Sequence, residues 1–177
     1  MNDVMWYLTR ATGIVAAVLA VAALVWGFFF SARATGDRRR PNWWLDLHNW
    51  LGGAALAFTI AHLATAYLDR DLALGVAGLF VPGVASGNQW AITWGVIALW
   101  TFVVAVFTSW PKRRFSRRTW RILHLGSVAG TGFAILHAVQ IGTDTGTLAA
   151  EAVALALVAV GTYALGVRLF GVLFGTR

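Results

Sequence analysis

Long runs without a charged residue are the feature that most constrains the fold of this chain. Three such runs extend over residues 11–30, 47–68 and 122–143. A helix needs about 20 apolar residues to cross the hydrocarbon core of a bilayer, so each run is long enough to span a membrane. Only 12% of the residues are charged and 59% are hydrophobic, which is typical of an integral membrane protein.

Two further spans are expected in the remaining sequence. Residues 72–111 carry no charge, but Pro82, Gly83 and the polar residues 86–89 interrupt them. This break leaves one full span after it and a short interfacial piece before it. The sequence therefore predicts an all-α integral membrane protein with one domain, residues 1–177. Its five transmembrane helices are expected at 5–32, 43–68, 90–110, 119–142 and 147–170.

Basic residues mark one side of the predicted bundle. Twelve of the 14 Lys and Arg residues follow the first, third or fifth span. They are Arg33, Arg38, Arg39, Arg40, Lys112, Arg113, Arg114, Arg117, Arg118, Arg121, Arg168 and Arg177. Because cytoplasmic loops carry an excess of Lys and Arg, this side is predicted to be cytoplasmic. The N-terminus is then expected outside and the C-terminus in the cytoplasm.

Composition also narrows the classes of partner and site. The net charge of +7 could indicate nucleic-acid binding, but basic residues beside apolar spans are explained by topology, so the lipid bilayer is the expected partner and nucleic acid is not. The chain has no cysteine, which excludes disulfides, iron–sulfur clusters and thiolate zinc sites. Histidine is therefore the main side chain left that could bind a metal.

The chain has only four histidines, and they are expected at two depths. His48 and His124 lie shortly after the basic loops, so both are predicted near the cytoplasmic face. His62 and His137 lie further along the same two spans, near the outer face. Each depth thus has one histidine on the second span and one on the fourth. At 1.5 Å per residue the two levels are about 20 Å apart.

Matched pairs of histidines favour a cofactor over simple packing. A single membrane histidine is most simply a packing residue or a helix–helix hydrogen bond, but four in two pairs make that explanation weaker. A zinc or iron transport site needs three or four ligands around one ion, which levels about 20 Å apart cannot provide. Two imidazoles from facing helices at one depth instead suit the axial positions of a haem, and two stacked haems would form an electron path.

The spacing of the histidines raises one difficulty. The 14 residues from His48 to His62 turn an ideal helix through about 320°, which returns to nearly the same face. The 13 residues from His124 to His137 give only about 220°. Helix distortion, or haems approached from different directions, must absorb this mismatch.

Longer segments around the histidines resemble a known family. The segments are LTRATG at 8–13, LDLHNWLGG at 45–53 and RRTWRILHLGS at 117–127, with the pattern His48-x13-His62 and His124-x12-His137. They resemble the ferric reductase-like transmembrane domain of ferric reductases, NADPH oxidases and the haem subunit of the bacterial periplasmic methionine sulfoxide reductase system. The chain is most similar to the short bacterial members. The resemblance implies a bacterial inner-membrane location and two b-type haems, the inner held by His48 and His124 and the outer by His62 and His137.

The chain also differs from the oxidase-type members of that family. These usually have six helices and a cytoplasmic domain for flavin and nicotinamide, whereas five helices are expected here and no glycine loop follows a strand. No FAD or NADPH site is therefore expected within this chain. The electrons are expected from a separate flavoprotein or from membrane quinol. The acceptor would be ferric iron, oxygen, quinone or an extracytoplasmic partner protein.

Two arginines are candidates for the haem propionates, which need cationic or hydrogen-bonding partners when they are partly desolvated. Arg10 is the basic residue near the outer end of the first span, and Arg121 lies one turn before His124. Arg121 could instead be a topology residue that reaches the interface. Trp50 and Trp100 lie deeper than the other tryptophans and are candidates for packing on a porphyrin.

The sequence thus predicts a haem-dependent membrane oxidoreductase that passes electrons from the cytoplasm to the exterior and needs a separate donor. Two alternatives stay open. The chain could be a haem-binding relay or assembly subunit of a larger redox complex that performs no catalysis itself. It could also be a haem-free scaffold or transporter whose histidines bind protons or neighbouring helices.

Overall fold

The computed structural model describes residues 3–31, 43–109, 115–142 and 146–174. Its helices are α1 (Asp3–Ser31), α2 (Trp43–Leu68), α3 (Val76–Phe80), α4 (Gln89–Ser109), α5 (Arg117–Ile141) and α6 (Leu148–Leu173). In this part of the chain, five helices are long and apolar enough to cross a membrane, and α3 is the short exception. The prediction of an all-helical membrane protein with five membrane-length helices is confirmed.

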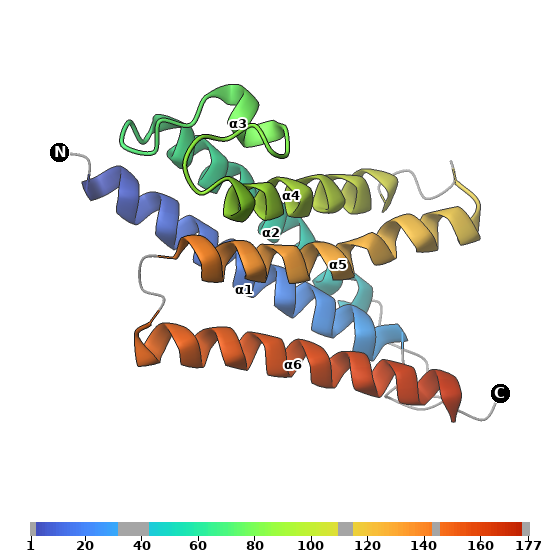
Figure 1. The fold of residues 1–177 in the computed structure, drawn as a ribbon. Coiled ribbons are helices and arrows are strands. Elements are labelled where there is room, and N and C mark those ends of the chain that lie inside the picture. Colours follow the sequence, from blue (N-terminus) through green and yellow to red (C-terminus); the bar gives the residue numbers. More distant parts are fainter. Residues whose placement is uncertain (1–2, 32–42, 110–114, 143–145, 175–177) are drawn as a thin grey trace.

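The five long helices run alternately in opposite directions (Figure 1). One end of the bundle, called the N end below, contains the starts of α1, α4 and α6 and the ends of α2 and α5. The opposite end, called the C end, contains the ends of α1, α4 and α6 and the starts of α2 and α5. His62 and His137 thus lie toward the N end, and His48 and His124 lie toward the C end.

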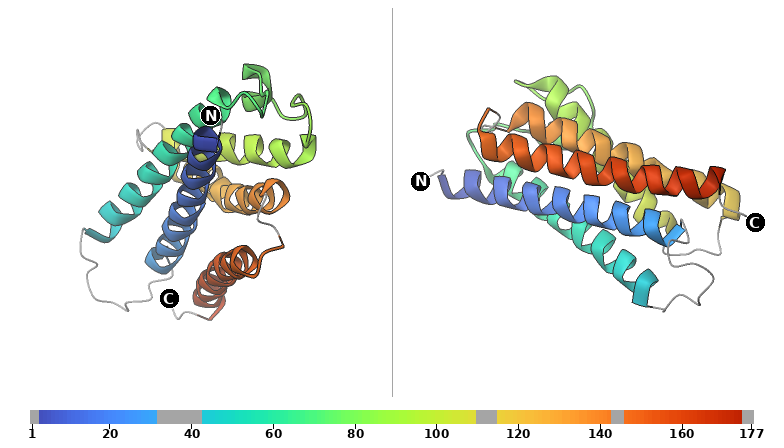
Figure 2. Two further views of the ribbon diagram at one scale, coloured as in Figure 1. Left: turned by 90° about the vertical axis from the view of Figure 1, so that its left-hand side faces the viewer. Right: turned by 90° about the horizontal axis from the view of Figure 1, so that it is seen from below.

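Two helix pairs form most of the packing. α1 lies along α2, and α4 lies along α5, whereas the backbones of α2 and α5 hardly approach one another. Figure 2 shows the two pairs crossing, with α1 nearest the other pair. The α4–α5 contact is close, because a Cβ on Gly130 of α5 would overlap Oγ1 of Thr101 on α4. The helices that carry the histidines are therefore held apart by their own partners.

α6 packs mainly on α1 and leaves most of its surface outside the bundle. Ala164 is buried there, and the rings of Phe29 and Tyr163 meet edge to face at 6.4 Å. α6 begins with an N-cap in which the hydroxyl of Thr147 accepts a hydrogen bond from the backbone N–H of Ala150. The large apolar side chains that α6 exposes suit a lipid environment.

The segment between α2 and α4 folds back along α4 (Figure 1). The indole N–H of Trp100, well inside α4, donates to the carbonyl of Phe80 at 2.9 Å. The backbone N–H of Gly83 donates to the hydroxyl of Thr93 at 3.0 Å. Gly83 has a φ of +81°, a conformation that favours glycine. α3 is therefore tied to the side of α4 and does not form a separate span.

Candidate functional site

The four histidines form two pairs across the bundle. The ring centroids of His48 on α2 and His124 on α5 are 5.8 Å apart, and the ring planes differ by 69°. The ring centroids of His62 on α2 and His137 on α5 are 6.1 Å apart, and the planes differ by 78°. The structure thus brings together the same two pairs that depth along the sequence suggested.

Three of the histidines are held by main-chain carbonyls of a neighbouring helix. The Nδ1 of His48 lies 3.0 Å from the carbonyl oxygen of Ala23, and the Nδ1 of His62 lies 2.7 Å from that of Thr9. Both acceptors belong to α1. The Nδ1 of His137 lies 2.8 Å from the carbonyl oxygen of Ala91 on α4. A carbonyl can only accept, so each Nδ1 carries a proton, and in the neutral ring Nε2 is then the nitrogen with the lone pair.

The Nδ1 of His124 has a side-chain hydroxyl as its partner in place of a carbonyl. Its Nδ1 lies 3.3 Å from Oγ of Ser109, at the end of α4. That hydroxyl donates its own proton to the carbonyl of Ala105 at 2.7 Å, so its oxygen is left to accept. It also accepts from the indole N–H of Trp120 at 3.2 Å, and the Trp120 ring stacks on the His124 ring at 5.1 Å. His124 can therefore also act as an Nδ1–H donor.

The different spacings on the two helices are accommodated by this arrangement. Both histidines of α2 rest on α1, and both histidines of α5 rest on α4. His137 bonds to α4 backbone near the N end, whereas His124 bonds to the last residue of α4. Each α5 imidazole is thus directed by its own α4 partner, and the two rings do not need to leave α5 from the same face.

The donor set and the ring separation fit a metal held between two imidazoles. A ligating nitrogen lies about 2.1 Å from its metal and the ring centre about 1 Å further, so two imidazoles on opposite sides of one ion have centroids about 6 Å apart. The observed 5.8 and 6.1 Å agree with this. Ligating histidines usually donate the other ring N–H to a backbone carbonyl or a similar acceptor, as all four can here. Among the described residues, no three His, Asp or Glu side chains converge as a multi-ligand site would require.

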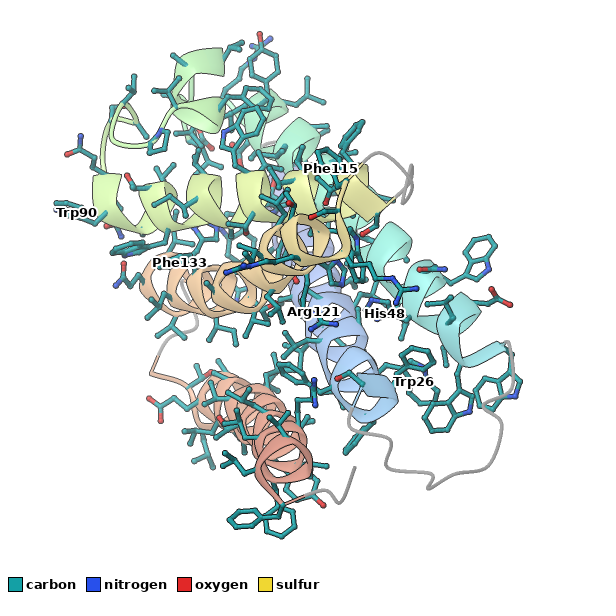
Figure 3. The ribbon with its side chains drawn as sticks, turned by 90° about the vertical axis from the view of Figure 1, so that its right-hand side faces the viewer. Trp26, His48, Trp90, Phe115, Arg121 and Phe133 are labelled. Atoms are coloured by element: carbon teal, nitrogen blue, oxygen red, sulfur yellow. The ribbon has the colours of Figure 1, made fainter. Side chains whose placement is uncertain are left out.

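The two candidate arginines lie at opposite ends of the bundle. The guanidinium of Arg10 lies over the ring of Trp6, 4.9 Å from its centroid. Arg121 is exposed on α5, at the same end as His48 (Figure 3). Near the N-end pair, the buried Oγ1 of Thr9 makes no hydrogen bond within the described part of the chain. A bound anionic group could satisfy this polar atom, which is otherwise costly to bury.

The tryptophans considered as haem contacts differ in their surroundings. Trp50 is 77% exposed, and Trp100 is 47% exposed and lines an open apolar groove of about 410 Å³ that includes Pro82 and Gly126. Both indoles therefore keep a large surface that the described part of the chain does not cover. The aromatic that contacts a candidate ligand is Trp120, whose ring stacks on that of His124. Its position four residues before His124, one helical turn, was the available sequence signal.

The comparisons with known proteins place this arrangement in a family. No match was found among curated proteins or among solved structures. The family model described as "Ferric reductase like transmembrane component" matches residues 12–135. The match contains His48, His62 and His124 and ends two residues before His137, and it covers α4 and most of α1. The chain therefore belongs to the ferric reductase-like transmembrane component family.

Proposed function

We propose that this protein carries electrons across a membrane through two b-type haems, one between His48 and His124 and one between His62 and His137. The observation that carries the proposal is the pairing itself. Each pair has ring centroids about 6 Å apart, and each Nδ1 is hydrogen-bonded. Family membership points to transmembrane redox activity. When bound, a b-type haem supplies an iron that takes up and gives away one electron.

The chain's own residues orient and insulate the ligands. The α1 carbonyls of Thr9 and Ala23 hold the α2 imidazoles, and the α4 groups hold the α5 imidazoles. Hydrogen bonds of this kind fix the ring orientation and make the ligating nitrogen more basic. Because α2 and α5 hardly contact each other by their backbones, a flat macrocycle could lie between them. Arg10 and Arg121 are proposed partners for the outer and inner propionates.

The proposed direction follows from the charges. Arg117, Arg118, Arg121 and Arg168 all lie toward the C end. The other basic residues predicted on this side lie outside the described residues; they are Arg33, Arg38, Arg39, Arg40, Lys112, Arg113, Arg114 and Arg177. The positive-inside rule makes this the cytoplasmic end of a bacterial inner-membrane protein. The electrons would enter there from a separate flavoprotein or from quinol. They would leave at the N end to ferric iron, oxygen, quinone or an extracytoplasmic protein.

Double variants test the pairing. Replacing both members of one pair, His48→Ala with His124→Ala, should leave about half of the wild-type haem, because the other pair is intact. Replacing one member from each pair, His48→Ala with His137→Ala, should remove nearly all tightly bound haem. Pyridine haemochrome analysis of the purified proteins measures this difference. Equal haem content in the two double variants, or no haem in the wild type after haem-replete expression, would reject the proposal.

Reconstituted vesicles test whether the two sites act in series. A reductant trapped on the C-end side should reduce an impermeant ferric acceptor on the N-end side only when both pairs are intact. The His48→Ala, His124→Ala variant and the His62→Ala, His137→Ala variant should each stop this transfer. Transfer that continues in either variant would contradict a path through both haems.

A further inference from the structure

Three of the four imidazoles lie directly against a glycine of the neighbouring helix. His62 bonds to the carbonyl of Thr9, and a Cβ added to Gly13 would lie 2.9 Å from its Nδ1 and 3.0 Å from its Cε1. Ordinary van der Waals contact begins at 3.4 Å, and real Cβ atoms essentially never come closer than 3.0 Å. The ring therefore occupies the place that a side chain at residue 13 would take.

His48 has the same surroundings at the other level. It bonds to the carbonyl of Ala23, and a Cβ on Gly27 would lie 3.1 Å from its Cε1 and 3.3 Å from its Nδ1. Both glycines belong to α1, and both lie four residues after the carbonyl that accepts the hydrogen bond.

His137 repeats the arrangement on a different helix. It bonds to the carbonyl of Ala91 on α4, and a Cβ on Gly95 would lie 2.8 Å from its Nδ1 and 3.0 Å from its Cε1. The glycine again lies four residues after the accepting carbonyl. The same local geometry thus occurs three times, on α1 twice and on α4 once.

The spacing of four residues has a physical cause. In an α-helix the carbonyl of residue i points along the axis toward residue i+4, which lies one turn above it on the same face. A ring nitrogen that bonds to that carbonyl from outside must approach over residue i+4. Any side chain there would compete with the imidazole for the same space, whereas glycine leaves the helix surface open to the ring.

We propose that Gly13, Gly27 and Gly95 are positioning residues that seat the imidazoles of His62, His48 and His137 against their carbonyls. The inference rests on the proposed function in so far as these imidazoles ligate haem. Each glycine acts on one level only. Gly13 and Gly95 serve the N-end pair and Gly27 serves the C-end pair. The fourth imidazole, that of His124, is placed by Ser109 and Trp120 instead.

Gly13, Gly27 and Gly95 are called the seat glycines below. Alanine at a seat glycine should be unfavourable, although alanine usually stabilises a helix. In an ordinary helix interior, Gly→Ala is favourable because alanine has the higher helix propensity. At a seat, the new methyl group would meet a rigid aromatic ring that is already bonded to the same helix. The ring would have to move away, which breaks the Nδ1 hydrogen bond and changes the direction of Nε2.

The test compares seat glycines with glycines that have open surroundings. The variants are Gly13→Ala, Gly27→Ala and Gly95→Ala, and the matched controls are Gly53→Ala and Gly166→Ala, where an added Cβ meets no atom within 4 Å. Haem content and potentiometric titration are measured on the purified proteins. Gly27→Ala should lose one haem or change its reduction potential. The affected haem should be the one that the His48→Ala, His124→Ala variant also loses. Gly13→Ala and Gly95→Ala should affect the other haem, and the controls should retain both.

A second measurement does not require haem. Nitrogen NMR of ¹⁵N-histidine-labelled, haem-free protein distinguishes Nδ1–H from Nε2–H rings. We expect His62 to be Nδ1–H in the wild type and in Gly53→Ala, and to lose that preference in Gly13→Ala. The inference would be overturned if the ¹⁵N chemical shifts of His62 change no more in Gly13→Ala than in Gly53→Ala.

The outcomes separate the two proposals. If the wild type and the controls bind two haems and the seat variants match them, the seating inference is wrong while the proposed function stands. Equal loss of both haems in a seat variant also overturns the inference, because a seat should affect one level only. If neither the wild type nor the controls bind haem, the proposed function fails, and the NMR measurement still decides whether the glycines seat the rings.

Discussion

The imidazole of His124 donates to the hydroxyl of Ser109 across 3.3 Å, whereas the other three imidazoles donate to main-chain carbonyls at 2.7–3.0 Å. This is the longest of the four contacts, and the only one of them that a side-chain substitution can remove outright. The C-end pair is therefore more open to adjustment by mutation than the N-end pair.

Ser109→Ala should raise the reduction potential of the haem proposed at the C end by tens of millivolts. Removal of the acceptor costs His124 a hydrogen bond of about 1 kcal/mol and makes its Nε2 less basic. A less basic ligand stabilises ferric iron less, so the reduction potential rises. The N-end haem should change little. Potentiometric titration should resolve the two proposed haems, and Ser31→Ala, whose hydroxyl donates to the carbonyl of Phe28, is the control. An unchanged C-end potential, or a lower one, would contradict the assigned role.

Arg10→Gln should lower the potential of the N-end haem or weaken its binding. A positive charge near that haem favours the reduced form, and its removal should shift the potential by tens of millivolts at the effective dielectric of a protein. Arg70→Gln is the matched control. Arg70 is exposed and lies two residues after the last residue of α2, at the N end of the bundle. Equal shifts at both haems, or full occupancy without any shift, would make Arg10 an interfacial residue paired with Trp6.

Gly130→Ala should destabilise the α4–α5 pair by about 1–3 kcal/mol, because its methyl group would overlap Oγ1 of Thr101. Adding Thr101→Ala should restore much of the loss by removing the clash. Gly132→Ala, where a Cβ meets no atom within 4 Å, should be tolerated. Unfolding of the purified protein in detergent measures the three variants and the double variant. No rescue by Thr101→Ala would show that the two residues do not share this contact.

The proposed orientation can be checked with single cysteines, because the chain has none of its own. Ser86 and Phe115 are both exposed, near the N end and the C end respectively. With the N end outside, an impermeant maleimide should label Ser86→Cys in intact spheroplasts. It should label Phe115→Cys only after lysis. The reverse pattern would invert the proposed direction of electron flow.

The membrane helices and the histidine pairs could be predicted because each depends on local sequence. Charge-free runs give the helices, and the distance of each histidine from the flanking charged residues gives its depth. The partners of the histidines could not be predicted in this way. Thr9, Ala23 and Ala91 contribute main-chain carbonyls, which every residue has, and their selection depends on how α1 and α4 pack. The same packing decides why Gly130 meets Thr101 while Gly132 meets nothing.

Two other features depended on tertiary packing in the same way. The mismatch between His124 and His137 on α5 could be stated from helix geometry, but its accommodation depends on Ser109 and on the backbone of α4. Trp50 and Trp100 were candidates for packing on a porphyrin because of their expected depth, yet depth does not determine which side of a helix a residue faces. Their exposure became clear only once the neighbours of α2 and α4 were known.

The pairing of α1 with α2 and of α4 with α5 has a consequence for biogenesis. Each pair consists of successive long helices, so each hairpin can form as soon as its second helix has been synthesised and inserted. The histidines are divided differently, since each level takes one from the first hairpin and one from the second. Neither ligand pair is complete until α5 has emerged from the ribosome and entered the bilayer. Capture of the proposed haems would therefore wait for the synthesis of α5, because nascent chains that stop earlier hold no complete pair of histidines.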